Sequence, residues 1–158
     1  KIINSGGING LGESLVNTNS KDFKFLQELI KEHATTQEEE DQIEDGLLSV
    51  RFQMESYLSA KPEAADVIPA GLFVEKLLKV INVSKKQFAE YIEVDYSNFI
   101  AVLKGRRKIN SELAINLGQI FQVNPVIWLH LESKNELTSA LVTFKDSFSL
   151  SGLLKRAS

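Results

Sequence analysis

The residues best suited to chemistry lie in the segment 84–108, which carries six basic and three acidic residues. Lys85 and Lys86 open this segment, and a second basic run follows near its end. Between the two runs stand Tyr96, Ser97 and Asn98, whose hydroxyl and amide groups both donate and accept hydrogen bonds. Cationic side chains neutralise phosphates, and short polar groups on a helix can hydrogen-bond base edges. The pattern therefore predicts a surface that binds double-stranded DNA.

Such a surface needs two short crossing helices, and the local sequence favours them. Close crossing requires a small residue on the leading helix, and Ala89 supplies it. Ser84 and Asp95 are typical N-cap residues for the two helices, and Gly105 fits the left-handed position after the second. The contacts between the helices are expected to be apolar, through Phe88, Ile92, Val94, Phe99, Val102 and Leu103. The segment thus predicts a helix-turn-helix whose second helix enters a major groove.

Two sets of contact residues follow from this arrangement. The base-contacting set is Tyr96, Ser97 and Asn98. The phosphate-contacting set is Ser84, Lys85, Lys86, Lys104, Arg106, Arg107 and Lys108.

The segment and its surroundings resemble the Xre/Cro/phage-repressor helix-turn-helix family, and more closely its HigA-type antitoxin branch. The resemblance covers about residues 67–137. The matching residues are Pro69, Glu75, Ser84, Phe88, Ala89, Val94, Asp95, Gly105 to Ile109, Leu113, Ala114, Leu117, Phe121, Asn124, Pro125, Trp128 and Leu129.

The resemblance implies an all-α protein with a five-helix, lambda-repressor-like domain over residues 67–137. It implies a cytoplasmic homodimer that represses its own operon and, in the antitoxin branch, also silences an RNase-like toxin. Ala101 joins the base-contacting set, at a position that family members often fill with a longer polar side chain. Glu93 stands in the turn where they usually have glycine.

The remainder of the chain divides into three segments. Residues 1–20 are expected to be a flexible arm, and residues 21–60 an acidic helical hairpin with His33 ending the first helix and Thr36 preceding the second. In that second helix an apolar seam follows spacings of 4, 3, 4 and 3, through Ile43, Leu47, Val50, Met54 and Tyr57. The seam is expected to pack on the first helix, a second copy of the chain or another protein. Residues 138–158 form a tail, either a strand or irregular.

Charge is divided between these segments. Residues 21–70 hold 5 basic and 12 acidic residues, a net of −7, whereas residues 71–137 hold 9 and 7, a net of +2. An acidic module beside a basic one indicates two different partners. The acidic hairpin is thus a candidate site for a small basic toxin or for dimerisation, and deleting residues 1–65 is expected to abolish neutralisation and spare DNA binding.

Several function classes find no support. The chain has no cysteine, which suits a reducing compartment, and no apolar stretch long enough to span a membrane. It has no glycine-rich phosphate loop, nucleophile elbow or histidine–glutamate zinc motif, so no enzyme, cofactor or metal site is expected. Two alternatives to an antitoxin stay open: a free-standing Xre-type regulator without a toxin, and a protein-interaction adaptor with a degenerate helix-turn-helix.

Overall fold

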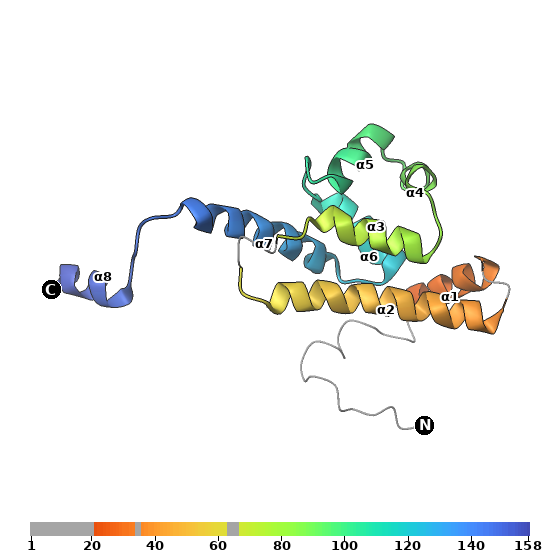
Figure 1. The fold of residues 1–158 in the computed structure, drawn as a ribbon, viewed down its shortest axis with the longest axis horizontal. Helices are drawn as coiled ribbons and strands as arrows, with labels where there is room; N and C mark the ends of the chain where they lie inside the picture. Colours follow the sequence, from red (N-terminus) through yellow and green to blue (C-terminus); the bar gives the residue numbers. More distant parts are fainter. Residues whose placement is uncertain (1–20, 34–35, 63–66) are drawn as a thin grey trace, which may run out of the picture.

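A computed structural model describes residues 21–33, 36–62 and 67–158 of the chain, and in these residues the structure consists of helices without strands (Figure 1). The helices are α1 (Lys21–His33), α2 (Gln37–Ser59), α3 (Ala70–Val80), α4 (Lys85–Tyr91), α5 (Tyr96–Leu103), α6 (Ser111–Phe121), α7 (Pro125–Thr143) and α8 (Leu150–Ala157). The predicted all-α class is confirmed for these residues. The arm expected at residues 1–20 lies outside them.

Side chains cap the starts of five helices, and the caps predicted at Ser84 and Asp95 are confirmed. Thr36, Ser84, Asp95, Asn110 and Asn124 each accept a hydrogen bond from a backbone N–H two or three residues further on. These N–H groups have no partner within the helix, so the caps satisfy donors that would otherwise be unpaired. The boundaries of α2, α4, α5, α6 and α7 are therefore set by local chemistry.

The ends of four helices are marked by left-handed residues. Asn82, Glu93, Gly105 and Gln122 have φ angles of 54°, 55°, 73° and 54°. After α5, the Gly105 N–H donates to the carbonyl of Val102, and the next N–H donates to the carbonyl of Ala101. This pair of bonds is the Schellman motif, in which the left-handed residue lets the last carbonyls find donors. The left-handed conformation predicted for Gly105 is confirmed.

The seam of α2 packs inside the molecule. Leu47, Val50, Met54 and Tyr57 are buried in the same apolar core as α3 and α7, against which α2 packs. Helix α1 contacts α2 and also α6, and its Ile30 belongs to that core. The acidic helices and the helix-turn-helix region therefore share one core, and the four buried residues of the seam are not available to a second copy.

Polar contacts also join α2 to the end of α6 and to α7. The Arg51 guanidinium of α2 donates to the carbonyls of Phe121 and Gln122 at 3.3 and 2.8 Å, where α6 ends. Burial lowers the pKa of Arg51, and the nearby Glu55 carboxylate opposes that shift. Closer to the C-terminal end of α2, the Tyr57 hydroxyl donates to the side-chain oxygen of Asn135 on α7.

The strand considered for residues 138–158 is wrong. Helix α7 continues to Thr143, and α8 follows after an extended segment. The reason is visible in the spacing of the leucines, since Leu137 and Leu141 are four residues apart and Leu150, Leu153 and Leu154 are three and four apart. All residues from Ser139 onward are exposed, and α8 lies beyond the end of α7, away from the other helices (Figure 1).

Among the described residues, no helix is both long enough and apolar enough to cross a bilayer.

Candidate nucleic-acid interface

The polar first turn of α5 is not covered by any other described part of the chain. Tyr96 is 48 % exposed, and Ser97 and Asn98 are exposed beside it. On the opposite side of α5, Phe99 and Leu103 are buried. The helix is thus held by its apolar face while its polar first turn projects into solvent. Ala101, the fourth predicted base contact, is half-buried.

Helix α4 and the turn after it fix the direction of α5. The Phe88 ring lies 5.4 Å from the Phe99 ring and 5.9 Å from the Phe121 ring, so α4 is joined to both α5 and α6. Ala89 is buried, and its carbonyl accepts from the Val94 N–H at 2.9 Å. A tight turn anchored by aromatic packing gives α5 one orientation.

Asp95 places a carboxylate at the exposed start of α5, and its role there is local. One carboxylate oxygen accepts from the Asn98 N–H at 3.0 Å, which is the cap bond. A negative charge at this end also complements the helix dipole. The acid therefore stabilises α5 and leaves the Asn98 side chain to face outward.

The basic run after α5 begins at the Schellman motif. Lys104 follows the helix directly, and the backbone N–H groups of Arg106 and Arg107 both donate to the carbonyl of Ala101. The backbone of the run is fixed in this way while all three cationic side chains remain exposed. The geometry places the cations at the C-terminal end of α5.

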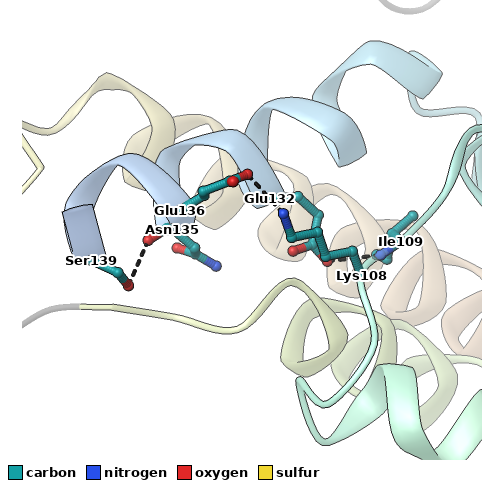
Figure 2. A network of polar contacts seen from close by, with 6 residues as sticks. All are labelled: Lys108, Ile109, Glu132, Asn135, Glu136 and Ser139. Carbon is teal, nitrogen blue, oxygen red and sulfur yellow. Dashed lines mark hydrogen bonds and ion pairs between the residues drawn. The ribbon is translucent and has the colours of Figure 1, made fainter.

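Lys108 forms an ion pair with a carboxylate of α7. Its Nζ lies 2.8 Å from Glu136 Oε2, and the Ile109 N–H donates to Glu132 Oε1 at 2.9 Å (Figure 2). The hydrogen bond and charge of Glu136, with a contribution from Glu132, raise the pKa of Lys108. Two acids one helical turn apart thus hold the end of the basic run against α7.

At the start of α4, one lysine is paired with a carboxylate and the next is exposed. Lys85 forms an ion pair with Glu75 of α3 at 2.8 Å. The Ser84 hydroxyl accepts from the Gln87 N–H, and the Gln87 side chain accepts from the Ser84 N–H, which completes a capping box. Lys86 is exposed.

The predicted phosphate-contacting residues therefore fall into two groups. Lys85 and Lys108 have carboxylate partners. In the part of the chain that the structure describes, no ion pair engages Lys86, Lys104, Arg106 or Arg107. Sequence reasoning missed the pairing, although the four-residue spacing of Glu132 and Glu136 already places both acids on one face of a helix.

Comparison with known proteins gives one informative similarity. No protein-family model matches the chain. The chain is similar to YddM of Escherichia coli, an uncharacterized HTH-type transcriptional regulator, with 30 % identity over 70 residues. The similarity spans 44 % of this chain and 74 % of YddM. The chain belongs to the HTH-type transcriptional regulators.

Members of this family are DNA-binding proteins and not enzymes. For an HTH-type regulator, the short helices α4 and α5, joined by a turn of four residues, have the lengths and connection that the motif requires. The antitoxin branch is a narrower assignment than this family membership.

Proposed function

We propose that the chain is a sequence-specific repressor of the antitoxin type, which binds an operator in double-stranded DNA as a homodimer. The observation that supports this most directly is the exposed first turn of α5, flanked by cations that have no ion-pair partner among the described residues. Tyr96, Ser97 and Asn98 contact base edges, and Ala101 lies against the same groove.

Phosphates are held mainly by Lys86, Lys104, Arg106 and Arg107. Four phosphate contacts in each subunit of a dimer give a slope of log affinity against log salt of about −7. Between 50 and 200 mM salt the affinity then falls by on the order of ten-thousandfold. Ser84 adds a hydroxyl contact, and Lys85 and Lys108 join when phosphate displaces their carboxylates.

The acidic helix α2 carries a second surface for the antitoxin role. Asp41, Asp45, Leu48 and Phe52 follow spacings of 4, 3 and 4, opposite the buried seam, and all four are exposed. Two acids beside two exposed apolar residues suit a small basic toxin, which charge attraction would steer to this face. We call these four residues the α2 outer stripe.

DNA binding is tested with a labelled duplex of the chain's own upstream region, by fluorescence anisotropy between about 50 and 200 mM salt. Arg106→Ala with Arg107→Ala is expected to weaken binding to all sequences and to flatten the salt slope by about 0.9 for each phosphate that is no longer neutralised. Asn98→Ala is expected to relax the preference at one base position, at a cost of about 1–3 kcal/mol.

The matched control is Lys24→Ala with Lys31→Ala, which removes two exposed cations from α1. This control is expected to leave the slope unchanged. If the intact protein does not bind DNA at the lowest salt, the repressor hypothesis is wrong and the protein-interaction adaptor is favoured.

The antitoxin role is tested against the product of the adjacent small open reading frame. Asp41→Asn with Asp45→Asn and Leu48→Ala is expected to reduce neutralisation of that protein and leave DNA binding intact. Full neutralisation by this variant would remove the α2 outer stripe from the proposal, and a locus without such a companion would favour the free-standing regulator.

A further inference from the structure

The C-terminal arm, residues 137–158, carries apolar side chains that no other described residue of the chain covers. Phe148 is 81 % exposed, Leu153 64 % and Leu154 60 %. The leucines of α8 lie on one face of a helix of eight residues that buries none of its side chains. A helix this short is not stable alone in water, so it requires a surface to pack on.

The chain also contains an apolar cavity of about 280 Å³ at the other end of the fold. It lies among α1, α2, α4 and α6, and most of its lining is aliphatic or aromatic. Tyr91, 66 % exposed, stands at its edge. Among the residues that line it are Ile30, Ile43, Val83, Phe88, Ile120 and Phe121.

The arm of a chain cannot reach the cavity of that same chain. The Tyr57–Asn135 contact places those residues of α2 and α7 side by side, and Figure 1 shows both helices running in the same direction. Ile43 lies 14 residues before Tyr57, and Thr143 lies 8 residues after Asn135. At about 1.5 Å per helical residue, the end of α7 is roughly 33 Å along the fold from the cavity.

The link between α7 and α8 is too short for that distance. Seven residue steps separate Thr143 from Leu150, and at most about 3.5 Å per step gives roughly 24 Å. Even with the link fully extended, Leu150 stops about 10 Å short of Ile43, and Leu154, about 6 Å further along α8, stops about 3 Å short. A cavity that α8 covers in this way therefore belongs to another molecule.

Charge points to a second copy of this chain as that molecule. The arm carries Lys145, Lys155 and Arg156 against Asp146, a net of +2. The first turns of α2, which lead to Ile43 in the cavity, carry Glu38, Glu39, Glu40 and Glu44 in addition to the two acids of the α2 outer stripe. An apolar face with a basic end thus meets an apolar cavity with an acidic border.

We propose that two copies of the chain exchange their C-terminal arms, so that α8 of each packs over the cavity of the other. The exchange is closed by a two-fold axis, since each copy supplies one arm and one cavity. The exposed leucines of the arm and the open side of the cavity are covered by the same event. This inference rests on the proposed homodimer and states how that dimer is held together.

Cross-linking tests the exchange directly, because the chain has no cysteine of its own. One variant carries Tyr91→Cys and another, with a different affinity tag, carries Leu153→Cys. After subunit exchange and mild oxidation, a disulfide between the two variants is expected, since the bond requires Cα atoms within about 7 Å. The matched control replaces Tyr91→Cys by Ile115→Cys, which lies on α6 outside the cavity lining and is 48 % exposed.

Three outcomes would overturn the arm exchange. They are equal cross-linking to the Ile115→Cys variant, cross-linking of Leu153→Cys only to itself, and a disulfide within one monomeric chain that carries both Tyr91→Cys and Leu153→Cys.

Sedimentation gives an independent measurement. Leu153→Asp with Leu154→Asp is expected to weaken self-association by on the order of a hundredfold, because two leucines are no longer buried. The far-UV circular dichroism contributed by helices α1 to α7 is expected to be unchanged. Leu48→Asp with Phe52→Asp, on the α2 outer stripe, is expected to leave self-association as it was, and an effect equal to that of the arm variant would contradict the inference.

The same variants separate this inference from the proposed function. A dimer that cross-links as expected but binds no DNA would refute the repressor and leave the arm exchange standing. A dimer that binds its operator but ignores the arm substitutions would refute only the exchange.

Discussion

At the scale of single residues, the turn before α5 contains a local strain. Glu93 adopts a φ of 55°, which is a left-handed conformation that glycine occupies without a steric cost. Its N–H donates to the Glu90 carbonyl, so the conformation is needed to end α4. Glu93 therefore lowers the free energy of unfolding, because the fold requires a left-handed conformation at this position.

Glu93→Gly is therefore expected to raise the free energy of unfolding by about 0.5–1 kcal/mol. Urea denaturation followed by circular dichroism measures the change. Glu90→Gly, inside α4, provides a control of opposite sign, with an expected loss of about 1 kcal/mol. Destabilisation by Glu93→Gly would show that the Glu93 side chain makes a contribution larger than the strain.

The ion pair of Lys108 is a second feature at this scale. In the proposed complex with DNA, Glu136 would compete with phosphate for the same ammonium group, and it lies on α7, outside the proposed DNA-binding surface. The proposed phosphate contact of Lys108 therefore requires that phosphate displace an acid that lies outside the DNA-binding surface.

Glu136→Gln is expected to raise DNA affinity a few-fold and to steepen the salt slope by up to about 0.9 per subunit. Salt titrations of the anisotropy signal measure both quantities. Glu112→Gln removes an exposed acid from the first turn of α6 and serves as the control for net charge. Equal gains from the two variants would assign the effect to the overall field and not to the Lys108 pair.

At the scale of elements, the orientation of α5 depends on how closely α3 approaches it. A Cβ atom added at Gly71 would lie 2.5 Å from Leu103 Cα and 2.6 Å from the Leu103 carbonyl oxygen. Both are backbone atoms, which a rotamer change cannot move. Glycine at this position therefore lets α5 pack directly on α3.

Gly71→Ala is expected to lower the free energy of unfolding by about 1–3 kcal/mol and to weaken DNA binding, because α5 must shift. Chemical denaturation and anisotropy on the same samples measure the two effects. Gly152→Ala, where the nearest atom is Ser149 Oγ at 3.2 Å, is the control and is expected to leave both unchanged. Normal stability of Gly71→Ala would show that the close approach is not required.

At the scale of the whole molecule, the acidic helices and the helix-turn-helix region share one apolar core, so we expect them to unfold together. Leu47 and Met54 of α2 are buried in the core that α3 and α7 share, and Arg51 satisfies carbonyls at the end of α6. Deletion of residues 1–65 would remove these groups, so the expectation that such a deletion spares DNA binding is not supported by the packing.

Leu47→Ala with Met54→Ala is expected to destabilise the whole chain in a single transition, by at least about 4 kcal/mol. The comparison is Leu48→Ala with Phe52→Ala, on the exposed side of the same helix, where the loss is expected to stay within about 1 kcal/mol. Thermal melts read by Trp128 fluorescence and by circular dichroism check whether the transitions coincide. Two separate transitions would show that α2 unfolds independently.

The sequence by itself determined where most helices begin and end and which face of α5 is polar. Caps such as Ser84 and Asp95, and the left-handed Gly105, act on backbone groups only a few residues away, so their effect can be read locally. The tertiary structure alone decided that the α2 seam packs on α3 and α7, and that Lys85 and Lys108 are paired while Arg106 and Arg107 are not ion-paired within the described part of the chain. Those outcomes depend on contacts between residues far apart in the chain, and the spacing of residue types does not encode which distant surface each one meets.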